Sequence, residues 1–234
     1  MTVVAIQTSR GQNVGVPGKN TMLVNGRPLF QYALEAAITA SSVDAVIAAT
    51  DIPEVLAFAR SAGIGTLCLE PNITDGNHYG AILTGTREAC RLYQDVQAVV
   101  VLLGNALGAS ASSLDAAVSR LLQRPEADSV VSVSPFPMFN PLRAFSSDGA
   151  RLTTTVPAGV LKLESASNDR YALGTPWFFN GSFWVIRPVS ILRNDGLPPF
   201  PWLGHHLLPF EQAPLMELDE EWQIPIIGHF RAGA

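Results

Sequence analysis

Runs of apolar residues alternate with helical patterns along the first half of the chain. Continuous apolar runs predict buried strands at Val3–Thr8, Ala45–Thr50, Gly65–Leu69, Ala98–Leu103 and Ser129–Val133. Between them, the patterns predict helices over Leu29–Ala40, Pro53–Ser61, Tyr79–Tyr93 and Ser112–Arg124. Every residue of the run that begins at Ala98 is apolar, which is typical of a central parallel strand covered on both faces. The alternation therefore predicts an α/β fold with a parallel, doubly wound sheet.

The pattern changes after Ser134. Residues 135–178 contain five prolines and the strand-like pieces Arg143–Phe145 and Val160–Leu163, which we interpret as an inserted arm of antiparallel strands. After the arm, the sequence predicts a return strand at Phe178–Ile186, and then a loop over 195–214 with a short helix at His205–Leu208. The last predicted elements are a strand at Leu215–Leu218 and a helix over Glu220–Phe230, which Pro225 limits. We interpret residues 1–234 as one domain that carries this arm.

Composition narrows the class of protein. The chain has 234 residues, of which 47% are hydrophobic and 15% charged, so it can bury a sizeable core and is unlike a disordered chain. Its net charge of −5 argues against binding to nucleic acid polymers or to anionic membranes. No apolar run approaches the roughly 18 residues of a membrane span, and the N-terminus lacks the features of a signal peptide. Cys68 and Cys90 lack metal-binding spacing, which predicts reduced core residues of a cytoplasmic protein.

The loop that follows the first strand carries the first candidate site. It reads SRGQNVGVPGKN over Ser9–Asn20, with Arg10 and Lys19 near its two ends. Its three glycines let the backbone approach an anion closely, and successive N–H groups can form an anion-binding nest. Ligands of open α/β sheets bind at the carboxyl ends of the strands, so the loop is a candidate phosphate site, with an ordinary surface loop as the alternative. It matches neither the Walker A pattern nor the dinucleotide fingerprint.

The same loop resembles the N-terminal signature R-x-G-S-K-G-[IV]-P-x-K-N of the sugar-acid cytidylyltransferases, the family of the CMP-sialic acid (acylneuraminate) synthetases. Arg10, Gly15–Pro17, Lys19 and Asn20 match it in spacing. Further segments resemble later parts of the family pattern in the same order: Leu23–Leu29, Ala48–Asp51, Asp128–Val133 and Asn180–Phe183. The resemblance thus extends over most of the chain.

The resemblance implies a three-layer, Rossmann-like nucleotide-diphospho-sugar transferase fold, with a mostly parallel mixed sheet and the arm 135–178 crossing to a partner in a homodimer. It implies transfer of CMP from CTP to a hydroxyl of a sugar acid or a related acidic acceptor, with release of pyrophosphate. By family position, the nucleotide would be held by Arg10, Gly11, Gly15, Lys19, Asn20 and Asn105. Arg10 and Lys19 would also stabilise the transition state as catalytic residues.

The resemblance also implies a divalent cation, Mg²⁺ (or Mn²⁺), that bridges the phosphates. Asp219 is the first candidate ligand and Glu217 the second, because residues two apart on a strand face the same side. The alternative is a solvated acidic patch that includes Glu220 and Glu221. Arg170 is the candidate contact for the acceptor carboxylate, with Arg143 as an alternative, and Asn180 is a second candidate substrate contact.

Three departures from the family pattern weaken the phosphate and metal sites. Val14 stands where the signature has a lysine, which removes one cation from the loop. Asn105 stands where the related Kdo cytidylyltransferases have a metal-binding aspartate, and Glu70 replaces an arginine. Two alternatives therefore stay open: a different nucleotide or acceptor, such as a phosphonate, or a relative without catalysis that binds a nucleotide or a protein partner. His78 either begins a helix or lines the nucleotide pocket, and the adjacent pair His205–His206 predicts a surface role.

Overall fold

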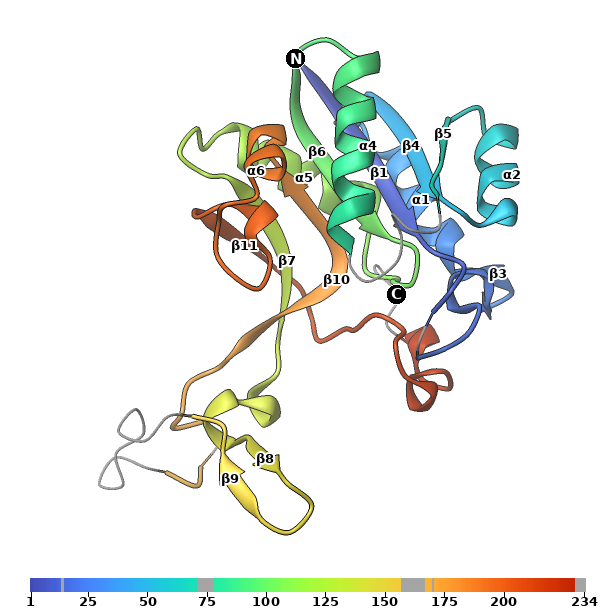
Figure 1. Cartoon of the computed structure of the whole chain (residues 1–234). Coiled ribbons are helices and arrows are strands. Elements are labelled where there is room, and N and C mark those ends of the chain that lie inside the picture. The colour runs from blue at the N-terminus through green and yellow to red at the C-terminus, as the bar shows by residue number, and fades with distance from the viewer. Residues whose placement is uncertain (14, 71–77, 157–166, 170, 230–234) are drawn as a thin grey trace.

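A mixed sheet forms the centre of the molecule. The computed structural model describes residues 1–13, 15–70, 78–156, 167–169 and 171–229. Within these residues, seven strands pair in the order β11-β7-β10-β6-β1-β4-β5 (Figure 1). Their bounds are β1 Thr2–Ser9, β4 Ala45–Thr50, β5 Gly65–Cys68, β6 Val96–Leu103, β7 Ser129–Pro135, β10 Trp177–Ile186 and β11 Leu207–Glu211. All neighbouring pairs are parallel except those of β10, which is antiparallel to both β6 and β7.

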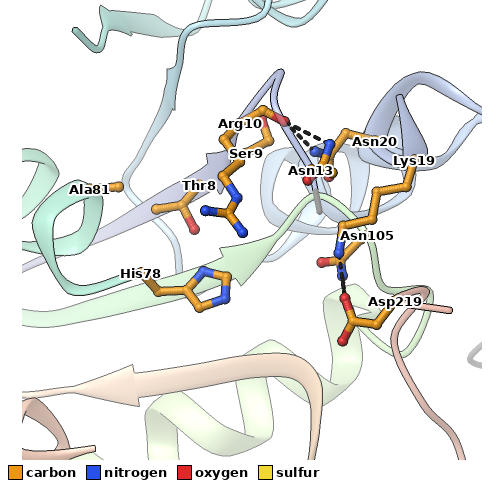
Figure 2. A pocket seen from close by; sticks show the side chains of 10 residues that line it. All are labelled: Thr8, Ser9, Arg10, Asn13, Lys19, Asn20, His78, Ala81, Asn105 and Asp219. Atoms are coloured by element: carbon orange, nitrogen blue, oxygen red, sulfur yellow. Dashed lines mark hydrogen bonds and ion pairs between the residues drawn. The ribbon is translucent and has the colours of Figure 1, made fainter. Parts of the chain in front are cut away.

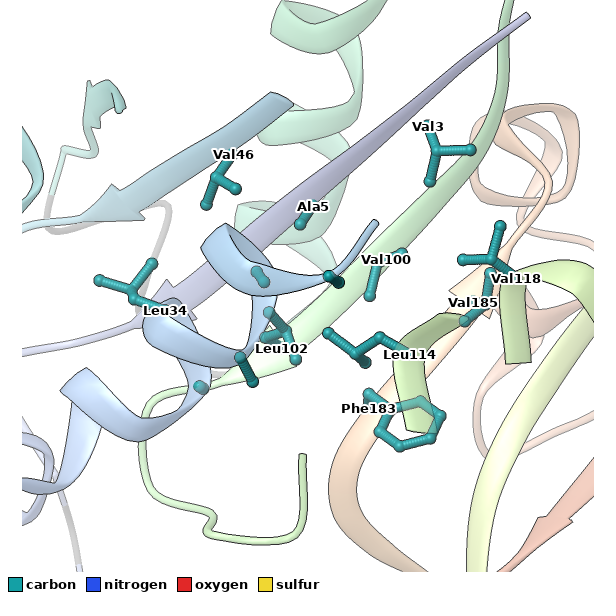
Figure 3. Close-up of a cluster of buried hydrophobic side chains, with 14 of the residues drawn as sticks. Val3, Ala5, Leu34, Val46, Val100, Leu102, Leu114, Val118, Phe183 and Val185 are labelled. Atoms are coloured by element: carbon teal, nitrogen blue, oxygen red, sulfur yellow. The ribbon is translucent and has the colours of Figure 1, made fainter. Parts of the chain in front are cut away.

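Helices cover both faces of this sheet. On one face lie α1 Leu29–Thr39, α2 Pro53–Ser61 and α5 Ala111–Leu122, and on the other lie α4 His78–Leu92 and α6 Pro188–Arg193. Alternate residues of each central strand enter opposite clusters: Val100 packs toward α1 and α5 (Figure 3), whereas Val99 and Val101 pack toward α4. A central strand is apolar at every position because helices cover both faces of the sheet and both sets of side chains are buried. The predicted three-layer α/β fold with a mostly parallel mixed sheet is confirmed.

The described part of the chain confirms the predicted strands and helices from Val3 to Val133, with ends that differ by two residues at most. A short hairpin of β2 Leu23–Val24 and β3 Arg27–Pro28 was not predicted, and neither was α6. Both predicted core cysteines are free thiols but exposed, so their core placement is wrong. Cys68 lies on β5, which is an edge strand of the sheet.

The predictions for the last thirty residues are mostly wrong. The segment expected to form a helix at His205–Leu208 instead enters β11, where Pro209 is tolerated because an edge strand has one row of unpaired N–H groups. Leu215–Leu218 has no regular structure. In place of the predicted C-terminal helix there are single 3₁₀ turns at Glu221–Gln223 and Ile227–His229, separated by a stretch that contains Pro225, which cannot donate a helical hydrogen bond.

The inserted arm leaves the sheet along β7 and returns along β10. It contains 3₁₀ turns at Pro137–Phe139 and Pro141–Arg143, and a hairpin of β8 Phe145–Ser147 with β9 Leu152–Thr154. Arg143 therefore ends a turn, and the predicted strand begins only at Phe145; the predicted strand Val160–Leu163 lies outside the described residues. Figure 1 shows the hairpin projecting well away from the seven-stranded sheet.

Candidate active site

A cavity of about 130 Å³ opens at the carboxyl ends of β1 and β6. Its walls come from four parts of the chain: the loop after β1, the start of α4, the turn after β6 and the C-terminal segment (Figure 2). The lining residues are Thr8, Ser9, Arg10, Asn13, Lys19, Asn20, His78, Ala81, Asn105 and Asp219.

Hydrogen bonds hold the loop after β1 in one shape. The side-chain amide of Asn20, buried to 3% exposure, donates to the carbonyl of Arg10 at 2.9 Å, and the amide of Asn13 donates to the same carbonyl at 3.1 Å. The backbone N–H of Gly11 donates to Asp51 Oδ1 at 2.7 Å. The loop is therefore fixed through its own backbone. The guanidinium of Arg10 and the amine of Lys19 remain directed into the cavity (Figure 2).

The C-terminal wall of the cavity is the irregular segment Leu215–Gln223, which is attached to the turn after β6 by its backbone. The N–H of Leu218 donates to the carbonyl of Asn105 at 2.8 Å, and the amide of Asn105 donates back to the carbonyl of Leu218 at 3.1 Å. A Cβ at Gly15 would lie 2.0 Å from the carbonyl oxygen of Asp219, so only glycine permits this close approach. The loop after β1 and the C-terminal segment, which form two walls of the cavity, are thus in backbone contact at Gly15 and Asp219.

Two carboxylates meet at this wall. The amide nitrogen of Asn105 lies 3.3 Å from Glu217 Oε2 and 3.2 Å from Asp219 Oδ1, and the amine of Lys19 forms an ion pair with Asp219. The pKa of Glu217 is raised from 4.5 to about 7, first by burial and then by the charge of Asp219, while Lys19 and the Asn105 hydrogen bond oppose the shift. Lys19 and Asn105 therefore offset only part of the cost of a negative charge on Glu217.

This donor set fits a shared Mg²⁺ site. Mg²⁺ in nucleotide sites is usually held by one or two carboxylates together with phosphate oxygens. Among the described residues, no group of three or more His, Cys, Asp or Glu side chains could hold a metal ion by itself. The pair Glu217 and Asp219 can therefore supply part of a coordination sphere, with the rest coming from a ligand.

His78 is the first residue of α4, and its imidazole lies in the cavity below the guanidinium of Arg10 (Figure 2). Although part of His78 is exposed to solvent, the desolvation of its ring among the atoms around the cavity lowers its pKa. The positive charges of Arg10 and Lys19 lower this pKa further, while Asp219 opposes them. The imidazole is consequently held in its neutral form near pH 7.

The sequence was compared with models of known protein families and with curated proteins. The family model described as cytidylyltransferase matches residues 4–146. The chain belongs to the cytidylyltransferase family. In sequence it is 29% identical over 131 residues to 3-deoxy-manno-octulosonate cytidylyltransferase from Chlamydia trachomatis, which covers 56% of this chain and 50% of that protein. The protein of the same name from Yersinia pseudotuberculosis is 38% identical over 69 residues, or 30% of this chain and 27% of the relative. The chain thus spans about half, or less, of the curated relatives that it matches.

Solved structures of low sequence identity share the fold. A CMP:2-keto-3-deoxy-manno-octonic acid synthetase complexed with CTP superposes with a TM-score of 0.69 at 13% identity, over 98% of both chains. A 4-diphosphocytidyl-2C-methyl-D-erythritol synthase from Anaerococcus prevotii gives 0.63 at 10% identity, over 98% of this chain and 97% of that one. No helix in the described part of the chain is long and apolar enough to cross a membrane.

The cavity brings together five of the residues that the sequence singled out for this family site: Arg10, Lys19, Asn20, Asn105 and Asp219. Gly15 and Glu217 lie directly behind them, since Gly15 touches Asp219 and Glu217 accepts from Asn105. The backbone of Gly11 is tied to Asp51, on the side of the loop toward α2. The sequence analysis did not predict that Thr8, Ser9, Asn13 and Ala81 line the cavity. Their positions could have indicated it: Thr8 and Ser9 end β1, Asn13 lies in the loop that follows, and Ala81 lies in the first turn of α4.

Asn180 is built into the sheet and is not one of the residues that line the cavity. Its side chain is 2% exposed; its oxygen accepts from Ser132 Oγ at 2.7 Å, and its nitrogen donates to Ser134 and Gln212 at 3.0 Å each. It lies at a bulge of β10, where the pairing with β7 shifts register and Gly181 has φ +75°. A Cβ at Gly181 would lie 2.9 Å from the Glu217 carboxyl carbon, so the bulge makes room for Glu217.

The other residues that the sequence singled out are not among the described residues that line the cavity. Arg170 and Val14 lie outside the described residues. Arg143 is exposed at the end of a 3₁₀ turn in the arm. The adjacent histidines His205 and His206 are exposed, and their backbone N–H groups donate to Asp128 Oδ2 at 2.8 and 2.9 Å, which agrees with the expected surface role.

Proposed function

We propose that this protein transfers CMP from CTP to a hydroxyl of a sugar acid of the 3-deoxy-manno-octulosonate class or of a related acidic acceptor. The acceptor oxygen forms a bond to the α-phosphorus while the bond to the β-phosphate breaks, and pyrophosphate leaves. The observation that carries the proposal is the convergence of Arg10 and Lys19 on one cavity opposite Asp219, in a chain of the cytidylyltransferase family. The names of the matched relatives support this choice of nucleotide and acceptor.

In this proposal the chain acts by positioning phosphates and neutralising their charge, which is what phosphoryl chemistry demands of a protein. Arg10 and Lys19 bind phosphate oxygens, while Asn20 and the glycines of the loop hold the backbone that presents them. The ion pair of Lys19 with Asp219 is 48% exposed on the carboxylate side, so the phosphates compete for the amine against a well-hydrated partner. Lys19 can therefore change partner at small cost.

A divalent cation, Mg²⁺ or Mn²⁺, completes the proposed site. Asp219 and Glu217 would hold it, and it would supply charge neutralisation to the phosphates when bound. Asn105 donates to both carboxylates and so keeps them directed toward the same point. Because burial and the charge of Asp219 raise the pKa of Glu217 to about 7, a nearby cation would favour its ionised form.

Homodimer formation through the arm is also part of the proposal. The arm exposes large apolar side chains to solvent, among them Phe139 at 56%, Phe145 at 57% and Leu152 at 66%. Exposed apolar groups gathered on one projecting element are typical of an interaction surface. The acceptor contacts at Arg170 and Asn180, and the cytoplasmic location, stay predictions from sequence.

The test is pyrophosphate release with CTP, Mg²⁺ and a panel of acceptors that includes 3-deoxy-manno-octulosonate, nonulosonic acids and phosphonates. We expect release with one acidic acceptor, and a rate at least about tenfold lower for Lys19→Ala, since a charged hydrogen bond is worth about 1.5–3 kcal/mol. Arg91→Ala is the matched control, because Arg91 is a surface cation that pairs with Glu88 on α4. Release by Lys19→Ala at the wild-type rate would show that the triphosphate lies elsewhere.

A second function is favoured by one observation. Asn105 is an amide at the point where the two carboxylates meet, so the described site offers two acidic ligands and a hydrogen-bond donor. Such a site suits a relative that binds nucleotide without catalysis. Calorimetry with CTP separates the two: tight binding without pyrophosphate release from any acceptor favours the binding protein, and turnover excludes it.

A further inference from the structure

The cavity contains one titratable side chain that the proposed function does not use. His78 begins α4, and its ring faces the same space as Arg10 and Lys19 (Figure 2). The following residue, Tyr79, stacks on Trp202 with 5.6 Å between ring centroids and donates its hydroxyl to the carbonyl of Ile191 at 3.1 Å. The start of α4 is thus held against the protein on the side away from the cavity, and His78 is presented from a fixed position.

The charges around the cavity indicate what this ring can do. The charged groups that line the cavity in the described residues are Arg10, Lys19 and Asp219, so their sum is one positive charge. Glu217, behind Asn105, adds negative charge at the C-terminal wall when it is ionised. A nucleoside triphosphate brings several negative charges to this space, more than the lining groups neutralise. A third cation facing the phosphates would therefore add to binding.

We propose that the imidazole of His78 binds the phosphates of the nucleotide as a cation, so that the site takes up one proton at this residue when the nucleotide binds. The proposal rests on the proposed function, because it assumes that a triphosphate enters this cavity. In the free protein, desolvation in the cavity and the neighbouring cations favour the neutral form of the ring. Phosphates placed between the ring and those cations reverse the electrostatic contribution, and the protonated form is then favoured.

The proposal fixes the direction of the pH dependence. Above both pKa values of His78, free and bound, the ring is neutral in both states and adds no charge to binding. Between the two values binding takes up a proton, so affinity for CTP increases as the pH falls. Protonation of Glu217 and of CTP itself changes with pH in the same range. Only the difference between the wild-type protein and a His78 variant therefore reports on His78.

The experiment follows the histidine imidazoles by NMR during a pH titration of the full chain, with and without CTP and in the absence of metal ions. The signal of His78 is assigned by its loss in His78→Gln. We expect its pKa to rise when CTP is added, while the signals of the exposed His205 and His206 do not shift. Calorimetry in two buffers of different ionisation enthalpy then measures proton uptake for the wild type, for His78→Gln and for the control His205→Gln.

We expect His78→Gln to bind CTP about tenfold more weakly at pH 6.5, as for the loss of one charge-assisted contact, and to match the wild type at pH 8.5. The control His205→Gln should bind as the wild type at both pH values. If wild-type protein binds CTP but the pKa of His78 does not rise, or if His78→Gln binds equally well at pH 6.5, the inference is overturned and the proposed function stands. If the wild type binds no CTP at any pH, the proposed function fails, and this inference fails with it.

Discussion

The two walls of the cavity are built in different ways. The N-terminal wall, Arg10–Asn20, follows a buried strand and is fixed by side-chain amides that hydrogen-bond to its own backbone. The C-terminal wall, Leu215–Gln223, begins without regular structure and ends in a single 3₁₀ turn; it is held by contacts with distant parts of the chain. The difference teaches that a wall of a site can be specified by the surface on which it packs, without secondary structure of its own.

The largest effect on stability is expected from loss of the apolar contact between the two walls. Leu218 is fully buried in a cluster with Val16 and Leu107. Leu218→Ala should lower the free energy of unfolding by about 2–5 kcal/mol, because it removes buried methyl groups and leaves a cavity. Urea denaturation measures this change, and Leu197→Ala, at a site that is 50% exposed, is the matched control. Equal stability of Leu218→Ala and wild type would mean that the C-terminal wall is held by its polar contacts alone.

The backbone contact between the walls comes next. Gly15→Ala places a methyl group against the carbonyl of Asp219, so we expect a loss of about 1–3 kcal/mol, as for other overpacked sites. For a chain of this size that corresponds to a fall in Tm of about 2–4 °C per kcal/mol. Gly11→Ala is the control in the same loop, because its nearest neighbour would be Asp51 at 3.7 Å. If the two variants unfold at the same temperature, the walls do not need this close approach.

The third effect depends on pH. The pKa of Glu217 is raised from 4.5 to about 7, so between these values the folded chain binds more protons than the unfolded chain, and stability falls as the pH rises. Glu217→Gln keeps a hydrogen-bond acceptor for Asn105 and removes this dependence. We expect the variant to be more stable than wild type by about 1–3 kcal/mol at pH 8, and equal to it near pH 4. Thermal unfolding in EDTA at several pH values measures the difference; parallel curves for the two proteins would contradict it.

The smallest effect on stability is expected for the ion pair that crosses the cavity. Asp219 stays hydrated without Lys19, so Lys19→Ala should change the free energy of unfolding by less than about 1 kcal/mol. Its effect on CTP binding should be much larger, which would separate ligand binding from folding at this residue. Denaturation and calorimetry on the same variant provide both values. A loss of several kcal/mol in stability would instead make the pair a structural link between the walls.

The fold was predictable where the sheet is covered on both faces. The runs Val3–Ile6 of β1 and Ala98–Leu103 of β6 are apolar at every position because helices pack on both sides of them, and this pattern is visible in the sequence alone. The prediction failed for β11, an edge strand that contains Pro209, and for α6, a helix of six residues that begins at Pro188. Short elements at the edge have weak local patterns, and tertiary contacts decide their structure.

The site was predictable for a related reason. Arg10 and Asn105 both follow apolar strands, so the rule that ligands bind at the carboxyl ends of strands places them at one edge of the sheet. Glu217 and Asp219 were expected to share one face of a strand. They do meet at Asn105, but an irregular segment that packs on the turn after β6 brings them there. The contact that places them joins residues more than a hundred positions apart, which no local pattern reveals.

The bulge at Asn180–Gly181 separates β10 into two stretches that are paired independently. On the arm side Trp177 to Phe179 pair with the end of β7, and on the sheet side Trp184 to Ile186 pair with its beginning. Because pairing restarts across the bulge, a change of one residue in the outer stretch does not invert which faces Trp184 and Val185 present to the core. The arm is therefore an exchangeable module: evolution or an engineer can lengthen, shorten or replace it while the half of β10 that lies in the seven-stranded sheet keeps its orientation.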